Sequence, residues 1–344
     1  MKKVSLFIFL IFSFSAISQD DDVLRVAFWN LENFFDPFVD STKMYNEYTP
    51  QGAQRWTLTR FYKKRNNLYK AILSFSDNRA LGLLGLCEVE NTFVTTMLFQ
   101  DTPLKKHNYR CVHYESRDRR GIDVALMYSI DKLTLIYSEA FSIKDNLNKH
   151  YRSRDILYAK FCCKGNDTLH CFVNHWPSRY GGERETIYHR CVAARHLRCK
   201  IDSLIKVSGE IPKIIVMGDF NDTPYDKSIV DVLKSVPCED AMEEDTLINL
   251  FSDNKILGFE GTLKHKYSWQ TFDQIMISKT LLHNKKSLHY KDKSATIFHE
   301  NFLFIDDDAY EMEYTKKGVW VVKVDGDLEN KAYYYMVRIN EKFV

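Results

Sequence analysis

The sequence predicts an α/β protein whose core is a pair of packed mixed β-sheets, with helices on the outside. Apolar segments of strand length outnumber long amphipathic helices, and the two do not alternate as in a regular βαβ array. The 344-residue chain has no internal repeat, low-complexity tract or Pro/Gly/Ser-rich linker. Its hydrophobic content of 45% is typical of globular proteins, so we expect one continuous domain with a large core.

Helical spacing of apolar residues predicts a long helix over residues 57–75, where Phe61, Leu68 and Ile72 recur on one face. A second long helix is expected over residues 183–206. The expected strands are residues 23–29, 81–87, 109–114, 122–128, 133–138, 157–163, 168–174, 213–217 and 271–277, followed by two short β-like runs at 319–324 and 332–339.

The first eighteen residues have the order of a secretory signal peptide. Two lysines precede an uncharged, mostly apolar run that ends at the small residues Ala16 and Ser18. This run is shorter than the about 20 apolar residues of a transmembrane helix, and no later segment is apolar for long enough to span a bilayer. We therefore expect a secreted or periplasmic protein without stable membrane insertion. The predicted organisation is a signal peptide at residues 1–18, a main domain at residues 19–305 and a divergent tail at residues 306–344.

The charges nearly balance, with 48 basic and 46 acidic residues and a net charge of +2. No global field attracts polyanions, so phosphate binding must come from local clusters. One such cluster lies between Arg55 and Arg65, and another comprises Arg117, Arg119 and Arg120. The first is more typical of an exposed helix face.

The eight cysteines include no Cys-x-x-Cys pair and no zinc spacing with histidine, which argues against a metal-thiolate site. Residues 157–163 and 168–174 predict a β-hairpin around Asn166-Asp167. This hairpin would place Cys162 opposite Cys171, where an oxidising compartment would allow a disulfide.

Polar residues stand at the ends of three expected strands. Asn30 follows the first strand, Glu88 follows the second, and Asp219 with Asn221 follows residues 213–217. In α/β scaffolds such strand ends present catalytic groups to a cleft. A capping or turn role would explain any one of them alone, but three such endings favour a functional site.

These residue types suit a hard divalent cation. Magnesium takes carboxylate and amide oxygens as ligands and keeps waters and substrate phosphate oxygens in its other positions, which Asn30 and Glu88 would complement. Asp219 and Asn221 are two residues apart, so both can point to the same side of an extended segment. Asp219 can orient or activate a water while Asn221 holds a phosphate oxygen.

A further polar cluster, Asn174-His175-Trp176-Pro177-Ser178-Arg179, ends another expected strand. A lone histidine is more often structural, but the polar neighbours here favour a functional one. His175 can donate a hydrogen bond to a phosphorane-like transition state, and Arg179 can neutralise charge there.

Six motifs follow one another along the chain. They are Ala27-Phe28-Trp29-Asn30-Leu31-Glu32-Asn33, Leu86-Cys87-Glu88-Val89-Glu90-Asn91, Arg120-Gly121-Ile122-Asp123-Val124-Ala125, Asn174-His175-Trp176-Pro177-Ser178, Gly218-Asp219-Phe220-Asn221-Asp222 and Trp269-Gln270-Thr271-Phe272-Asp273-Gln274-Ile275. In content and order they resemble the endonuclease/exonuclease/phosphatase superfamily of deoxyribonuclease-like, metal-dependent phosphohydrolases. The resemblance covers residues 25–305.

This resemblance implies a four-layer α/β sandwich, with two packed mixed sheets flanked by helices, and a water that attacks phosphorus in line. It implies a metal held chiefly by Asn30 and Glu88, with Mg²⁺ as the expected ion and Mn²⁺ or Ca²⁺ as alternatives. The candidate catalytic residues are His175, Asp219, Asn221 and Asp273, and the candidate substrate-binding residues are Arg120, Arg154, Asn174 and Arg179. Arg154 resembles a family arginine near the substrate, although a buried salt bridge explains it equally well.

The chain departs from the family pattern near its C-terminal end. Family members usually carry a late Ser-Asp-His, whose histidine acts as general base. Here the histidines after Asp273 are His283, His289 and His299, and none follows a Ser-Asp pair. His299 or a metal-bound hydroxide could take the place of the missing base.

We therefore expect an exported, Mg²⁺-dependent phosphodiester hydrolase that acts on nucleic acid. A phosphomonoesterase or lipid phosphodiesterase would use the same residues, because only the rim of the cleft distinguishes these activities. Aromatic residues such as Tyr45, Tyr48 and Trp56 could stack bases or pack in the core. The rival from another class is a catalytically degenerate metal- or phosphate-binding relative that lacks the C-terminal Ser-Asp-His base. No feature predicts a protein partner.

Overall fold

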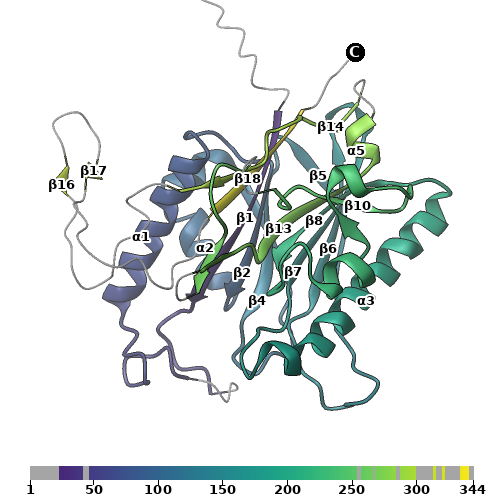
Figure 1. Ribbon diagram of the computed structural model, residues 1–344. Helices are drawn as coiled ribbons and strands as arrows, with labels where there is room; N and C mark the ends of the chain where they lie inside the picture. Colours follow the sequence, from purple (N-terminus) through teal and green to yellow (C-terminus); the bar gives the residue numbers. More distant parts are fainter. Residues whose placement is uncertain are drawn as a thin grey trace, which may run out of the picture.

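A computed structural model describes residues 23–41, 46–253, 257–265, 268–283, 287–299, 313–314, 320–321 and 334–340 of the protein (Figure 1). Two large mixed β-sheets pack face to face, and helices cover the outer face of each. This is the four-layer α/β sandwich that the sequence predicts. The predicted signal peptide and Tyr45 lie outside the described residues.

The first sheet is built around the N-terminal strand. Its strands are β1 (Val23–Phe34), β2 (Leu83–Val89), β3 (Tyr109–His113), β4 (Asp123–Ser129), β14 (His289–Tyr290), β15 (Thr296–Phe298) and β18 (Tyr334–Asn340). The order is β14-β18-β1-β2-β4-β3, and β15 also pairs with β18. The pair β1 and β2 is parallel, whereas the other pairs are antiparallel.

The second sheet has the order β5-β6-β7-β8-β13-β10-β9. Its strands are β5 (Leu133–Phe141), β6 (Ile156–Cys163), β7 (Thr168–His175), β8 (Lys213–Asp219), β9 (Ser235–Val236), β10 (Leu247–Asn249) and β13 (Asp273–Ser278). The pair β7 and β8 is parallel, like β1 and β2 in the first sheet. Two small antiparallel sheets pair β11 (Leu263–His265) with β12 (Ser268–Gln270) and β16 (Glu313–Tyr314) with β17 (Trp320–Val321).

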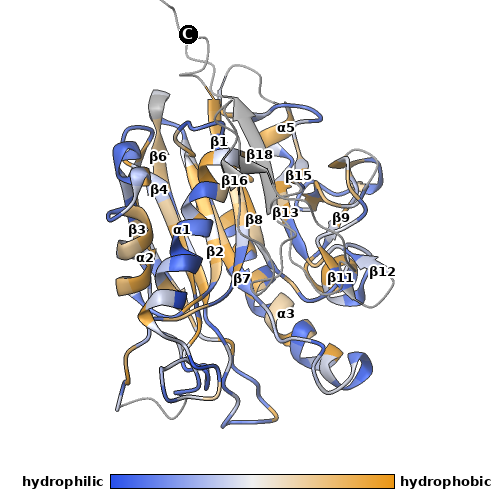
Figure 2. Cartoon of the chain, turned by 90° about the vertical axis from the view of Figure 1, so that its left-hand side faces the viewer, coloured by the Kyte–Doolittle hydropathy of each residue, from blue (hydrophilic) through white to orange (hydrophobic). Residues whose placement is uncertain are grey.

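Helices α1 (Leu58–Phe75) and α2 (Thr92–Phe99) cover the first sheet, and α3 (Glu183–Ser208) covers the second (Figure 1). A short helix, α5 (Thr280–His283), follows β13. On α1 the apolar residues Phe61, Leu68 and Ile72 are buried against the sheet, as their spacing predicts. One apolar core lies between the sheets and one beneath the helices on each side, so hydrophobic strands are enclosed between more polar outer helix faces (Figure 2).

The hairpin of β6 and β7 is confirmed, but its register contradicts the expected cysteine pair. Cys162 lies opposite Thr168, and Cys171 lies opposite Ala159. The chain turns through a short 3-10 segment at Lys164–Asn166, which offsets the two cysteines by three positions. Both thiols are free in this structure, so the Cys162–Cys171 disulfide is wrong.

The segment predicted as a divergent tail contributes to the first sheet, because β18 lies beside β1 over the register Val23 with Asn340 to Phe28 with Tyr335. Among the residues that the structure describes, no helix is both long and apolar enough to cross a membrane.

Candidate active site

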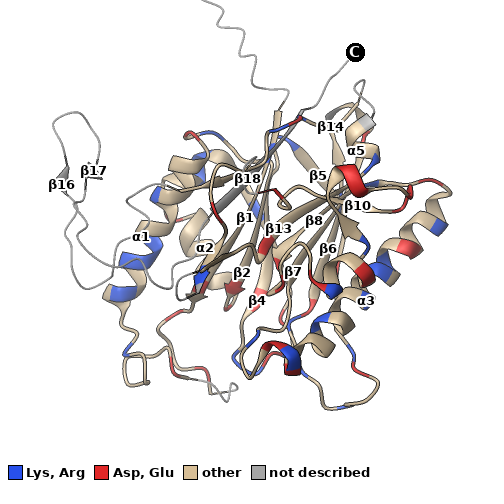
Figure 3. Ribbon diagram, viewed as in Figure 1, with Lys and Arg blue, Asp and Glu red and all other residues tan. Residues whose placement is uncertain are grey.

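The parallel pairs β1–β2 and β7–β8 bring the predicted polar residues to one edge of the sandwich. Asn30 lies opposite Cys87, the residue before Glu88, near the end of β1 and β2. In the second sheet His175 lies opposite Asp219 at the end of β7 and β8. Because these ends point the same way, the lower edge in Figure 1 collects them, and acidic positions gather around the lower ends of the central strands in Figure 3. We call this the catalytic edge.

Glu88 is aimed at the edge by an irregularity in its strand. Its φ angle is 58°, in the left-handed region, and the register of β2 with β4 shifts between Cys87 and Val89. Such a bulge redirects a side chain at a cost of about 1–3 kcal/mol, a strain that is typical of functional sites. The backbone N–H of Asn33 donates a hydrogen bond of 2.8 Å to Glu88 Oε2, which leaves Oε1 toward the second sheet.

His175 joins the two sheets at this edge. Its Nε2 lies 3.9 Å from Glu88 Oε1 and 3.8 Å from Asp219 Oδ2, and the side chain is 3% exposed. Burial, followed by the nearby charges of Arg154 and Arg120, lowers the pKa of His175 well below its ordinary value. The imidazole is therefore neutral at pH 7, and it can donate a hydrogen bond without carrying charge.

Asp219 is held by neighbours on both sides. Its Oδ1 accepts a hydrogen bond of 3.0 Å from the backbone N–H of Asn221, and its Oδ2 accepts one of 3.1 Å from the amide of Asn30. Burial, together with the Glu88 carboxylate, raises the pKa of Asp219 to about 6, against the lowering effect of these two hydrogen bonds and the charge of Arg154. A carboxylate with such a pKa is charged at pH 7 yet basic enough to accept a proton.

Arg154 positions the histidine. Its Nε donates to the carbonyl of His175 at 3.2 Å, and its Nη2 donates to the carbonyl of Trp176 at 2.5 Å. Its Nη1 lies 3.4 Å from Asp118 Oδ2. The structure thus fits both readings of the sequence, a buried salt bridge and a charge close to the catalytic edge.

Sequence reasoning missed Asp118. It precedes Arg120 in the irregular segment 114–122, where no strand alternation marks it and the neighbouring arginines suggest only a basic cluster. Its Oδ1 accepts a 2.9 Å hydrogen bond from the backbone N–H of Arg120 and lies 3.8 Å from the Nε of that arginine. Arg120, whose side chain is 38% exposed, is the more accessible of the predicted arginines at this edge.

Asn174 is at the edge but cannot reach a substrate from its position. It is fully buried, its amide donates to the carbonyl of Met217 at 3.3 Å, and its oxygen accepts from Trp176 Nε1 at 3.1 Å. We therefore assign it to positioning Trp176 rather than to substrate binding.

Arg179 is likewise committed to protein groups. Its guanidinium contacts Asp222 at 3.0 Å, Asp226 at 2.7 Å and Glu183 at 3.0 Å. Its Nε also donates to the carbonyl of Asn221 at 2.8 Å. Three carboxylates neutralise its charge, so Arg179 shapes the loop after Asp219 rather than offering a phosphate-binding cation.

Asn221 and Asp273 lie where the sequence predicts. Asn221 has a φ of 51° and donates from its side chain to the carbonyl of Trp176 at 3.0 Å, which ties the loop after β8 to the loop after β7. Asp273 begins β13, lies opposite Asp219 in the sheet and is 4% exposed. All ten predicted residues are thus on or beside one edge.

The oxygen donors at this edge fit a divalent cation. Glu88 and Asp219 converge on one histidine nitrogen, and the side-chain oxygen of Asn30 accepts a hydrogen bond from the backbone N–H of Glu32 at 2.9 Å. An amide oxygen has two lone pairs, so it can also bind an ion. Carboxylate and amide oxygens are the ligands that Mg²⁺, Mn²⁺ and Ca²⁺ prefer.

The late histidines differ in their distance from this edge. His289 on β14 lies opposite Asn340, at the end of the sheet where β1 begins. His299 follows β15, whose Phe298 lies opposite Tyr334 near the end of β1. His299 is therefore on the side of the catalytic edge, where its ring stacks on Phe259 at 4.5 Å.

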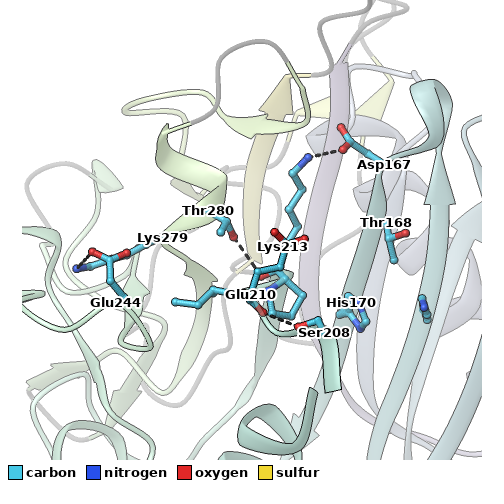
Figure 4. Close-up of a pocket in the computed structure, with 12 residues that line it drawn as sticks. Asp167, Thr168, His170, Ser208, Glu210, Lys213, Glu244, Lys279 and Thr280 are labelled. Atoms are coloured by element: carbon cyan, nitrogen blue, oxygen red, sulfur yellow. Dashed lines mark hydrogen bonds and ion pairs between the residues drawn. The ribbon is translucent and has the colours of Figure 1, made fainter. Parts of the chain in front are cut away.

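Two other features lie apart from the catalytic groups. Tyr48 and Trp56 pack with Phe35, and Trp56 is 7% exposed, so these aromatic residues belong to the core. A surface cavity of about 670 Å³ lies at the opposite end of β8 and is lined by paired charges such as Lys213 with Asp167 (Figure 4). It contains none of the predicted site residues.

Comparisons with known proteins agree with this architecture. The family model described as the endonuclease/exonuclease/phosphatase family matches residues 25–321. No curated protein sequence matches the chain significantly.

Two solved structures illustrate the shared fold. The chain is similar to the mannosyl-6-phosphatase Bt3783 of Bacteroides thetaiotaomicron VPI-5482, with 15% identity, coverage of 93% of this chain and 100% of that chain, and a TM-score of 0.55. It is also similar to the human Nocturnin catalytic domain with bound sulfate anion, with 14% identity, coverage of 93% and 95%, and a TM-score of 0.51. At such identities the likeness shows the fold and does not select a substrate.

Proposed function

Because the chain belongs to the endonuclease/exonuclease/phosphatase family, we propose that it is an exported, Mg²⁺-dependent phosphodiester hydrolase that acts on nucleic acid. The observation that carries this proposal is the convergence of Glu88 and Asp219, from different sheets, on Nε2 of the neutral His175. Export rests on the charged-then-apolar order of residues 1–18.

Glu88 and Asn30 are the residues that would hold the metal. When bound, Mg²⁺ would polarise a phosphoryl oxygen and favour the deprotonated form of the attacking water. The protein supplies the orientation, since Asn33 fixes one oxygen of Glu88 and Glu32 fixes the amide of Asn30.

Hydrolysis needs one proton acceptor and stabilisation of charge on phosphorus. Asp219 accepts the proton of the water as its oxygen forms a bond to phosphorus, and the bond to the leaving oxygen breaks on the opposite face. His175 donates its N–H to a phosphoryl oxygen as charge develops there. Arg120 adds positive charge from the exposed side, and the leaving oxygen takes a proton from solvent.

The surface beside the edge supports a polynucleotide substrate. Phe38 and Phe93 are 52% and 40% exposed and lie edge to face at 5.6 Å. On the first turns of α1, Lys64 donates to the carbonyl of Glu32 at 2.6 Å, which brings a cation within two residues of Asn30. Exposed aromatic rings next to basic side chains can stack bases and contact the phosphate backbone of single strands.

The test is a substrate panel for the chain from Gln19, with Mg²⁺ or with chelator. The panel contains supercoiled plasmid, single-stranded RNA, a bis-aryl phosphodiester, an aryl phosphomonoester and sphingomyelin. We expect chelator-sensitive cleavage of the nucleic acids and the bis-aryl diester. Monoester or lipid hydrolysis alone would replace the substrate class, and Mg²⁺ binding without any turnover would identify a degenerate relative. Glu139→Gln, at an ion pair on β5, is the matched control for Glu88→Gln.

A further inference from the structure

A second group of potential metal ligands lies on the first sheet, outside the catalytic groups. It comprises His113 at the end of β3, Glu115 just beyond it, and Asp123 at the start of β4. One ligand atom from each residue lies within 4.8 Å of the others. His113 and Glu115 are two residues apart, so both can project to the same side of an extended segment.

The group lies on the face of the first sheet that packs against α1 and α2, rather than on the face that packs against the second sheet. Asp123 lies opposite Val89, and His113 lies opposite Ala125. Val89 and Ala125 belong to the core beneath α1 and α2, whereas Cys87 and Val124 face the core between the sheets. The bulge between Cys87 and Val89 separates this group from Glu88, because it turns the Glu88 side chain toward His175 of the second sheet.

The carboxylate of Asp123 is buried, and its two oxygens differ in their hydrogen bonding. The residue is 2% exposed, and its Oδ1 accepts a 2.9 Å hydrogen bond from the backbone N–H of Ser116. Within the described part of the chain its other oxygen, Oδ2, accepts no hydrogen bond. This oxygen faces Nε2 of the buried His113 at 3.7 Å, which is too long for a hydrogen bond.

The spacing suits a shared ion better than a direct contact. Two ligands of a tetrahedral Zn²⁺ ion, each about 2.0–2.2 Å from the metal, lie about 3.3–3.6 Å apart. The observed 3.7 Å needs a contraction of only a few tenths of an ångström. A cation here would also offset the negative charges of Glu115 and Asp118, which lie near the buried Asp123 carboxylate.

We propose that His113, Glu115 and Asp123 form a second metal site, which takes a divalent first-row transition ion of the Zn²⁺ class. One imidazole with two carboxylates favours such an ion over Mg²⁺, which prefers oxygen ligands alone. The ion would fasten segment 114–122 to the ends of β3 and β4. Through Asp118 this segment reaches Arg154, which holds the carbonyl of His175. The site is thus structural, and it supports the catalytic edge without taking part in hydrolysis.

Metal binding tests this proposal without any activity. The chelator-treated chain from Gln19 is dialysed against buffered Zn²⁺ and analysed for bound metal, and Co²⁺ is used in parallel for its absorption spectrum. The variants are Asp123→Asn, His113→Gln, the exposed Glu115→Gln, and Glu88→Gln to disable the catalytic site. Asp145→Asn, at another buried aspartate, is the matched control.

We expect Zn²⁺ bound by wild type to remain in Glu88→Gln and Asp145→Asn. Asp123→Asn and His113→Gln should lose at least about 100-fold in Zn²⁺ affinity, and Glu115→Gln should bind more weakly while folding normally. Zn²⁺ binding by Asp123→Asn at the wild-type level would overturn the proposal, as would no binding by wild type or loss of all binding in Glu88→Gln. Failure here leaves the proposed hydrolase untouched, because that activity depends on Glu88.

Discussion

Gly218→Ala should damage both stability and catalysis, because Gly218 on β8 lies directly against Asn174 on β7. A Cβ atom at this position would lie 2.4 Å from the backbone oxygen of Asn174 and 2.7 Å from its Cβ. Asn174 is fully buried, and Gly218 lies directly opposite it. The next pair along the strands is His175 with Asp219, so a displacement of the strands at Gly218 also moves these two catalytic groups.

The size of the effect follows from the displacement. Ordinary van der Waals contact begins near 3.4 Å, so the strands must separate by about 1 Å to admit the methyl group. Overpacking of this kind costs about 1–3 kcal/mol in the free energy of unfolding. A shift of about 1 Å in catalytic groups costs about 10²-fold in rate, so kcat/KM for the bis-aryl phosphodiester should fall by about that factor.

Urea unfolding and steady-state kinetics measure the two effects separately. Gly209→Ala is the matched control, since a Cβ there meets nothing within 4 Å and its φ of 73° makes the substitution costly only to stability. Wild-type kcat/KM in a destabilised Gly218→Ala variant would refute the argument that this contact sets the His175–Asp219 pair.

Three further predictions concern other groups. Arg154→Lys removes the paired contacts to the carbonyls of His175 and Trp176 and should lower kcat/KM about 10–100-fold, whereas Arg198→Lys, at a buried arginine on α3, should not. Burial and nearby Lys160 lower the pKa of His170 to about 4. Between about pH 6.5 and about pH 4 the histidine is protonated in the unfolded chain but not in the folded one. The free energy of unfolding should therefore fall by up to about 3 kcal/mol as the pH drops through this range. In His170→Leu the free energy of unfolding should depend less on pH over the same range. His299→Gln should change kcat less than about 10-fold, whereas a larger loss, in the 10²–10⁴-fold range of a positioned base, would make His299 rather than Asp219 the proton acceptor.

The layers of the fold were predictable because strand and helix periodicities are local properties of the sequence. The face of α1 that carries Phe61, Leu68 and Ile72 is confirmed, as is the strand that ends at Asp219. The first strand is also present, but it continues past Asn30 to Phe34. Family membership is confirmed by the match over residues 25–321. The register between strands was harder to predict from the sequence, because the offset of Cys162 from Cys171 depends on the geometry of one turn.

The hydrogen-bond and ion-pair partners of individual side chains could not be predicted, because these partners are distant in the sequence. Arg179 resembles a phosphate ligand until Asp222 and Asp226, more than forty residues later, are seen to neutralise it. Asn174 resembles a substrate-binding residue in the sequence, but in the structure its side-chain amide is hydrogen-bonded to Met217 and Trp176. The direction of the Glu88 side chain depends on a bulge at which Glu88 has a positive φ, and no residue in its sequence motif predicts such a bulge.

The most direct test of the account is the rate of bis-aryl phosphodiester hydrolysis by the chain from Gln19, measured against Mg²⁺ concentration for wild type, Glu88→Gln and Glu139→Gln. We predict saturable, Mg²⁺-dependent turnover in wild type and Glu139→Gln that is abolished by chelator. Glu88→Gln should lose at least about 10²-fold in kcat/KM at any Mg²⁺ concentration. Turnover in Glu88→Gln equal to wild type would contradict the assignment of the catalytic edge.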